Sequence, residues 1–183
     1  LATGTGAPQR NRIEHLQLVA PQDMDLLRRV RPVASMQPIH LCADMGPADR
    51  LWGGRSRYAY AFRTIADAGC MLAFGSDAPV EPIDPFLGVF AAVTRQNLEL
   101  QPGNGWYPEE RIGAREAIAA YTVNPAIAAG NHRDLGDLSA GKLADFVVLP
   151  EDPLAIPVAN LPNLVPTATF VGGECVHPHE PRR

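Results

Sequence analysis

The feature that most constrains the fold is an alternation of short apolar runs with helix-like segments. Three apolar runs predict strands, at residues 12–19, 31–39 and 70–77. Residues 21–30 and 56–69, which lie between them, have the pattern of helices. Continuous apolar strands joined by helices are typical of a parallel sheet that is buried on both faces, as in an open α/β sheet or an α/β barrel.

Capping residues support two of the predicted helices, whereas the composition of residues 40–55 indicates a loop. Residues 84–96 begin with Asp84, which is suited to cap a helix, and Pro85, which is suited to its first turn. Gly69 is suited to close the helix at 56–69. Residues 40–55 are rich in glycine, proline and aspartate, so we expect a long loop there.

The pattern changes in the last third of the chain. Residues 108–130 predict two helices with a break at Asn124-Pro125. A strand is expected at 144–149, and residues 167–177 have the pattern of a hairpin with Gly172-Gly173 at its turn. These strands predict a small sheet that is separate from the first one.

Composition excludes several classes of function. The chain has 183 residues, 46% of them hydrophobic, so it can bury a substantial core. Its net charge of −4 provides no basic surface for nucleic acid, and no run approaches the roughly 20 apolar residues that a membrane span needs. The 3 cysteines are widely spaced and form no Cys-x-x-Cys pair, which favours reduced thiols in a cytoplasmic protein.

Polar side chains follow each of the three predicted strands. His15 lies in or at the end of the first, His40 directly after the second, and Asp77 directly after the third. Because the carboxyl ends of parallel strands meet at one edge, where α/β proteins carry their functional residues, we expect these side chains to converge there. If the two residues serve one site, the side chains of His15 and Asp77 should lie within ~10 Å of each other.

Five segments together resemble a known family: RIEHLQLV, SMQPIHL, DAGCMLAFGSDAPVEPIDP, AAVTRQ and GDLSAGKLADFVVL. In this order and spacing the chain resembles the amidohydrolase superfamily, in particular the amidohydrolase family 3 branch that contains N-substituted formamide deformylases. The resemblance covers nearly the whole chain. It implies an α/β fold in which a metal-dependent TIM-type (β/α)8 barrel lies beside a small β-sandwich.

A complete barrel needs ~250 residues, so the resemblance further implies that this chain holds only the last βα units. Residues 1–130 would then be the C-terminal part of the hydrolase barrel. Residues 131–183 would be part of the small β-sandwich domain and a tail.

The resemblance also implies roles for the strand-end residues. His15 matches a metal-ligating histidine, and Asp77 matches an aspartate that binds metal and takes the proton of the attacking water. His40 would lie near the substrate, where it hydrogen-bonds a carbonyl oxygen or holds a loop. The implied cofactor is a divalent metal, with zinc favoured and one or two ions in the complete protein.

Each of these residues also has a structural interpretation. His15 could be a hydrogen-bonded core histidine, Asp77 a turn cap ahead of Ala-Pro, and His40 a structural residue. Asp44 and Trp52 could line a pocket, although loop composition favours a solvated surface.

Five further residues receive structural interpretations. Glu14 should point away from His15 and form a salt bridge or pack. Lys142, the only lysine, belongs to the turn AGKLAD and is not expected to bridge metals. His132 is expected on the surface, and His177-Pro-His179 matches a His-x-His pair only on paper and is expected in a disordered tail.

The sequence therefore favours the C-terminal portion of a metal-dependent amidohydrolase that cleaves C–N bonds, amide or N-formyl, in a small molecule by metal-activated water. Because a catalytic zinc site typically uses three protein ligands and two are matched, the chain alone should be incomplete and inactive. The alternative is a catalytically inert structural fragment that forms homo-oligomers through unpaired strand edges. A non-metal α/β protein is disfavoured by the matched GDLSAGKLADFVVL segment.

Overall fold

The computed structural model describes residues 11–178, which form two small sheets and the helices around them. The strands are β1 (Arg12–Glu14), β2 (Val33–Met36), β3 (Met71–Phe74), β4 (Phe146–Val148), β5 (Ala168–Val171) and β6 (Glu174–Pro178). The α-helices are α1 (Met24–Val30), α2 (His40–Trp52), α3 (Phe62–Asp67), α4 (Pro85–Thr94), α5 (Ala114–Tyr121) and α6 (Val123–Ala129). Short 3₁₀-helices are η1 (Pro21–Asp23), η2 (Gly53–Tyr58), η3 (Pro108–Glu110) and η4 (Val158–Asn163).

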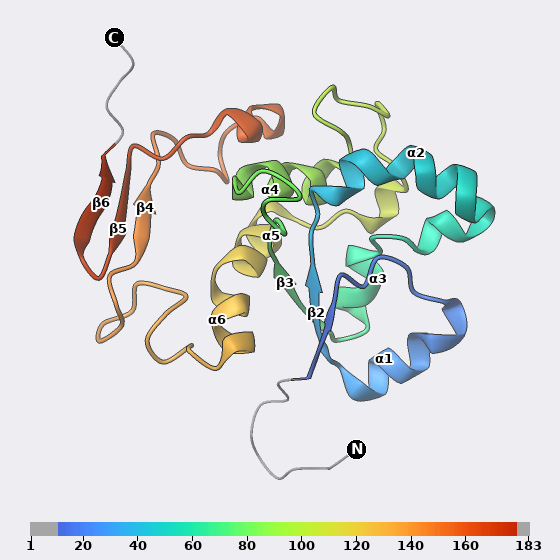
Figure 1. Cartoon of the computed structure of the whole chain (residues 1–183), viewed down its shortest axis with the longest axis horizontal. Helices are drawn as coiled ribbons and strands as arrows, with labels where there is room; N and C mark the ends of the chain where they lie inside the picture. The colour runs from blue at the N-terminus through green and yellow to red at the C-terminus, as the bar shows by residue number, and fades with distance from the viewer. Residues whose placement is uncertain (1–10, 179–183) are drawn as a thin grey trace.

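The first sheet is parallel and has the order β1-β2-β3, as the alternating pattern predicts. Ala34 in the central strand pairs with Ile13 on one side and with Leu72 on the other. In Figure 1 helices α1, α2 and α3 lie to the right of these strands, and α4, α5 and α6 lie to the left. The architecture is therefore α/β.

The core forms where these helices meet the central strand. Val33, Ala34 and Met36 of β2 are all buried, which explains why this strand consists of apolar residues. β1 is shorter than predicted because the backbone turns left-handed at His15 (φ 67°) and Leu16 (φ 38°). The turn ends the strand and redirects the chain.

The expected loop at 40–55 is wrong, because most of it forms helix α2. Leu41, Met45 and Ala48 recur at helical spacing and are buried, so the apolar face of this helix packs into the core. Pro47 lies inside the helix, where its ring removes one backbone hydrogen bond. Burial of that face outweighs this local cost.

Two other helix boundaries differ from the prediction, and one agrees with it. The helix predicted at 56–69 is divided, since η2 ends at Tyr58 and α3 begins at Phe62. The break predicted at Asn124-Pro125 occurs at Thr122, so Pro125 falls in the first turn of α6. The first backbone N–H groups of a helix have no partner within it, so a proline there is tolerated. Asp84 caps α4 as predicted, since its side chain accepts a hydrogen bond from the backbone N–H of Phe86 (2.8 Å).

A buried arginine links three backbone segments. The guanidinium of Arg95, which is fully buried, donates to the carbonyl oxygens of Trp106 (2.5 Å), Tyr60 (2.5 Å) and Ala59 (3.2 Å). Its charge also lies 5.5 Å from the ring centre of Phe62. Burial lowers the pKa of Arg95 to about 10, which leaves the group charged at neutral pH.

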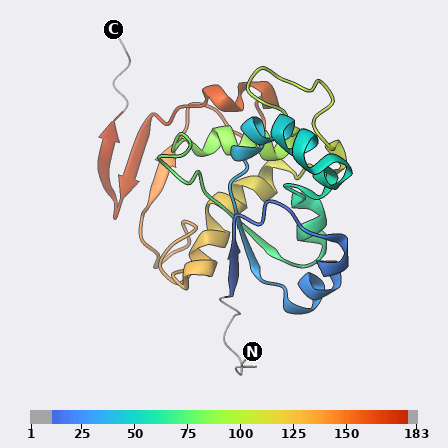
Figure 2. The same cartoon turned by 45° about the vertical axis from the view of Figure 1, so that its right-hand side comes forward.

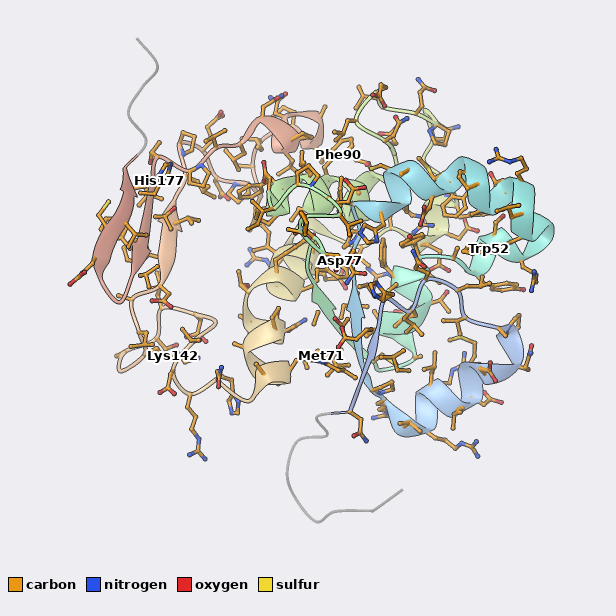
Figure 3. The ribbon with its side chains drawn as sticks, viewed as in Figure 1. Trp52, Met71, Asp77, Phe90, Lys142 and His177 are labelled. Atoms are coloured by element: carbon orange, nitrogen blue, oxygen red, sulfur yellow. The ribbon has the colours of Figure 1, made fainter. Side chains whose placement is uncertain are left out.

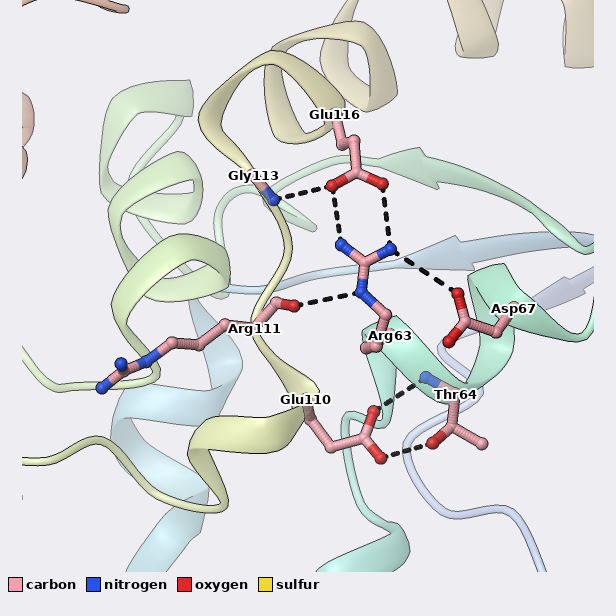
Figure 4. A network of polar contacts seen from close by, with 7 residues as sticks. All are labelled: Arg63, Thr64, Asp67, Glu110, Arg111, Gly113 and Glu116. Atoms are coloured by element: carbon pink, nitrogen blue, oxygen red, sulfur yellow. Dashed lines mark hydrogen bonds and ion pairs between the residues drawn. The ribbon is translucent and has the colours of Figure 1, made fainter.

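A polar network joins α3 to the segment that leads into α5 (Figure 4). The guanidinium of Arg63 donates two hydrogen bonds to the carboxylate of Glu116 in a bidentate ion pair (3.1 and 2.7 Å). The same carboxylate accepts from the backbone N–H of Gly113 (2.8 Å), so Glu116 caps the start of α5. Glu110 accepts from both the backbone N–H and the hydroxyl of Thr64.

The second sheet is antiparallel, with the order β4-β5-β6, and it lies to one side of the helices in Figures 1 and 2. Gly172 (φ 59°) and Gly173 (φ 84°) form the predicted hairpin turn in the left-handed region. Phe146 and Phe170 stack across β4 and β5, with ring centres 4.5 Å apart. This is the second, separate sheet that the last third of the chain predicts.

The prediction of a disordered tail is wrong at its beginning. His177 pairs with Thr169 and belongs to β6, because the hairpin ladder continues to that point. His179 lies outside the residues that the structure describes. Within the described part of the chain, every helix is too short or too polar to traverse a lipid bilayer.

Candidate functional site

The predicted site residues all follow strands of the first sheet at its carboxyl edge. Because β1, β2 and β3 are parallel, the residues that follow Glu14, Met36 and Phe74 all leave the sheet at this edge. His15 follows β1 directly, and Gln37 follows β2 directly.

His15 and His40 come together here. The Nδ1 atom of His15 lies 2.9 Å from the side-chain oxygen of Gln37. The His15 ring also stacks on that of His40, with ring centres 6.5 Å apart and planes inclined by 17°. Two residues that follow β2 therefore hold the imidazole of His15, which follows the neighbouring strand β1.

His40 is the first residue of α2, and its backbone N–H donates to the carbonyl of Gln37 (3.1 Å). Its Nε2 atom is buried, and no residue within 11–178 offers it a hydrogen-bond partner. Since a buried polar atom without a partner costs about 1–3 kcal/mol, this nitrogen is suited to bind a polar group that the described residues do not supply.

Asp77 follows β3 by three residues and lies at the same edge. Its backbone is left-handed (φ 56°), and its carbonyl accepts from the backbone N–H of Val80 (2.9 Å), so it begins a tight turn. Its side chain is exposed. Figure 3 labels Asp77 beside the first sheet and Lys142 in the segment that leads to the second sheet. The expected ~10 Å separation between the side chains of Asp77 and His15 stays a prediction.

The edge carries too few ligands for a complete metal site. Among residues 11–178, no three His, Cys, Asp or Glu side chains lie close enough together to hold a metal ion. His15 and Asp77 have suitable donor atoms for a divalent ion, an imidazole nitrogen and a carboxylate. They fit part of a ligand set, and the metal-binding roles of both residues stay predictions.

A second polar cluster lies beside this edge. Asp44 on α2 accepts hydrogen bonds from the side chains of Gln17 (3.1 Å) and Tyr60. Burial and the hydrogen bond to Asp44 raise the pKa of the Tyr60 hydroxyl, which stays protonated as a donor. Asp44, Gln17 and Trp52 also line a pocket of about 310 Å³, so the pocket interpretation of Asp44 and Trp52 is compatible with the structure.

Sequence reasoning missed Gln37 and the Gln17–Tyr60 contact. An uncharged amide after an apolar strand carries weak chemical information, although its strand-end position matches that of His15. Tyr60 is 43 residues from Gln17 and lies within a predicted helix, so no local signal links the two.

The contacts of the remaining polar residues are compatible with their structural interpretations. Glu14 pairs with Arg12 (2.5 Å), and hydrogen bonding to Ser35, with the charge of Arg12, lowers the pKa of its carboxyl. Lys142 pairs with Asp137 (2.6 Å) ahead of β4, and His132 is exposed. The 3 cysteines are free, as expected; Cys70 is buried and Cys175 is exposed.

Comparisons with known proteins place these features in a family. The sequence profile described as the amidohydrolase family matches residues 2–177. The protein YtcJ of Bacillus subtilis is 33% identical over 170 residues, which are 92% of this chain and 32% of YtcJ. The N-substituted formamide deformylase of Arthrobacter pascens is 31% identical over 131 residues, which are 70% of this chain and 24% of that enzyme.

A solved structure agrees. An uncharacterized metal-dependent hydrolase from Pyrococcus furiosus superposes with a TM-score of 0.66 at 31% identity, over 78% of this chain and 28% of its own. The chain spans about a quarter to a third of the length of these proteins. The profile match over nearly all of the sequence shows that the chain belongs to the amidohydrolase family.

Proposed function

We propose that this chain is the C-terminal portion of a metal-dependent hydrolase that cleaves a C–N bond, amide or N-formyl, in a small molecule. The observation that carries the proposal is the presence of His15 and Asp77 after parallel strands of one sheet, at its carboxyl edge. The relative from Arthrobacter pascens is named a formamide deformylase, which supports an N-formyl or amide substrate.

The architecture proposed for the whole protein follows the same reasoning. Residues 1–130 would contribute the last βα units of a (β/α)8 barrel, and residues 131–183 would contribute strands to a small β-sandwich. Three parallel strands in the first sheet and three antiparallel strands in the second support this division. The remaining ligands would come from strands outside this chain.

In this proposal His15 and Asp77 hold a divalent ion, with zinc favoured and one or two ions in the complete protein. Such an ion, when bound, acts as a Lewis acid and lowers the pKa of water to ~7. Asp77 then accepts the proton of the attacking water and delivers it to the leaving nitrogen as the C–N bond breaks. His40, whose Nε2 is buried and without a partner among residues 11–178, donates a hydrogen bond to the substrate carbonyl oxygen.

The test is the substitution Asp77→Asn in the full-length protein. The amide cannot accept the proton of the attacking water, so turnover should fall at least ~10²-fold, the lower end of what a positioned general base contributes. Circular dichroism should show an unchanged fold, and the variant should retain much of its zinc. The matched control is Asp25→Asn, an exposed aspartate on α1, which should retain full activity. Near-normal turnover in Asp77→Asn would refute the proposed base.

The same proposal predicts that the 183-residue chain binds zinc weakly, since it supplies two of the three or more ligands. Stoichiometric, tightly held zinc in the purified chain would contradict that prediction. The protein is proposed to act in the cytoplasm on a small-molecule substrate.

A second candidate is an inert structural fragment that self-associates. It is favoured by the strand order β1-β2-β3, in which β1 and β3 each have one neighbour among the described strands. Unpaired edges of this kind bind other strands. A strictly monomeric chain by light scattering at high concentration would exclude this candidate.

A further inference from the structure

A glutamine at the end of β2 holds the proposed metal-binding histidine. Gln37 is 8% exposed, so its amide is a buried polar group that needs partners. Its side-chain oxygen lies 2.9 Å from Nδ1 of His15, a residue 22 positions earlier in the chain. This contact joins the ends of two neighbouring strands.

The surroundings leave Gln37 little freedom. It follows Met36 directly, and its backbone carbonyl accepts from the N–H of His40 at the start of α2 (3.1 Å). On the other side, His15 has a left-handed backbone (φ 67°), a conformation that persists only where neighbouring contacts hold it. The stacked ring of His40 further limits how the His15 ring can turn.

The chemistry of the contact selects one form of the imidazole. A neutral histidine carries its proton on one ring nitrogen, and the other nitrogen has the lone pair. The amide oxygen of Gln37 can only accept a hydrogen bond, so Nδ1 must be the nitrogen that carries the proton. The lone pair is then on Nε2, which makes Nε2 the metal-binding atom.

We propose that Gln37 is a positioning residue that fixes the Nδ1–H form of His15 and so presents Nε2 to the divalent metal. The inference rests on the proposed function, because it assumes that His15 is a metal ligand. It adds the atom that binds and the group that selects that atom.

The direct test reads the protonated nitrogen without any metal. The chain is labelled with ¹⁵N-histidine, and the ring-nitrogen signals of its 5 histidines are recorded at a pH where the imidazoles are neutral. The variant His15→Gln assigns the signal of interest. The wild-type chain should show the Nδ1–H form of His15, and Gln37→Leu should show a mixture of both forms.

Gln37→Glu is the matched rescue variant, because it keeps an oxygen that accepts from Nδ1. It should restore the Nδ1–H form, whereas a purely structural role of Gln37 would not distinguish the Leu and Glu variants in this way. The inference is overturned if the wild-type chain shows the Nε2–H form, or if Gln37→Leu keeps the wild-type signal. If Gln37→Leu does not fold, the wild-type and Gln37→Glu spectra decide the case.

Zinc titration of the full-length protein distinguishes a failure of the Gln37 role from a failure of the metal-binding role of His15. Gln37→Leu should weaken zinc binding about 10–100-fold, as is typical when the partner of a ligating histidine is removed. A change of less than about 3-fold, with a changed ring proton, would overturn the metal-directed part of the inference. If His15→Gln binds zinc as tightly as wild type, the proposed function fails at His15, while the spectra still judge the contact with Gln37.

Discussion

Replacement of Gly88 by alanine tests the close packing between α4 and α5. Gly88 is buried in α4, and a Cβ atom built on it would lie 1.9 Å from the hydroxyl oxygen of Tyr121 and 2.9 Å from its Cζ. No ordinary contact is that short, so the ring of Tyr121 must move. That ring packs edge-on against Phe74 at the end of β3, and its hydroxyl donates to the carbonyl of Gly75 (3.4 Å).

The expected change in the free energy of unfolding is the balance of a stabilising and a destabilising effect. In an exposed helix, Gly→Ala stabilises by about 1 kcal/mol. Overpacking of a full site costs about 1–3 kcal/mol, and loss of the aromatic contact with Phe74 costs a further 0.5–1.5 kcal/mol or so. The steric cost outweighs the helix propensity. We therefore expect Gly88→Ala to lower the free energy of unfolding by about 2 kcal/mol.

The assay is urea denaturation followed by circular dichroism. Gly88→Ala is compared in the wild-type chain and in the Tyr121→Phe variant. In Tyr121→Phe the nearest atom becomes Cζ at 2.9 Å, so Gly88→Ala should cost at least about 1 kcal/mol less there. The control is Gly46→Ala, since Gly46 lies in α2 with no atom within 4 Å of its built Cβ; it should stabilise by up to about 1 kcal/mol. A neutral Gly88→Ala, or an equal cost in both backgrounds, would refute the reasoning.

Two further predictions concern charged residues. Arg95→Leu should destabilise the chain by at least about 3 kcal/mol in urea denaturation, because three buried carbonyls lose their donor; a loss under about 1 kcal/mol would contradict this. Glu116→Gln should cost only about 0.5–1 kcal/mol at pH 7, since the Glu116 and Arg63 side chains are 49% and 33% exposed and solvent screens the pair. The hydrogen bonds from Arg63 hold the pKa of Glu116 below its usual 4.5, so this contribution is present above that pH and is lost as pH falls through the folded pKa. The stabilities of wild type and Glu116→Gln should therefore converge in acid, and a constant difference down to low pH would exclude the pair as its source.

Local sequence signals determined the elements that depend on neighbouring residues. The apolar runs predict three strands and their parallel arrangement, and parallel strands place His15 and Asp77 at one edge. Asp84 caps α4, and Gly172-Gly173 turns the hairpin, because each effect acts within a few residues. The family motifs are likewise contiguous segments, which a sequence displays directly.

Only the tertiary structure decided the features that depend on contacts between distant segments. Helix α2 forms through Gly46-Pro47 because its apolar face is buried, although the local signals predict a loop. The hydrogen bond between Gln37 and His15 exists because two strand ends become neighbours in the sheet. Arginine is usually a surface residue, yet the charge of Arg95 is surrounded by carbonyl groups up to 36 positions away. Propensity and capping contribute at most about 1–2 kcal/mol each at one position, so burial of a whole helix face or of a charged group can override them, and burial is set by which distant residues meet.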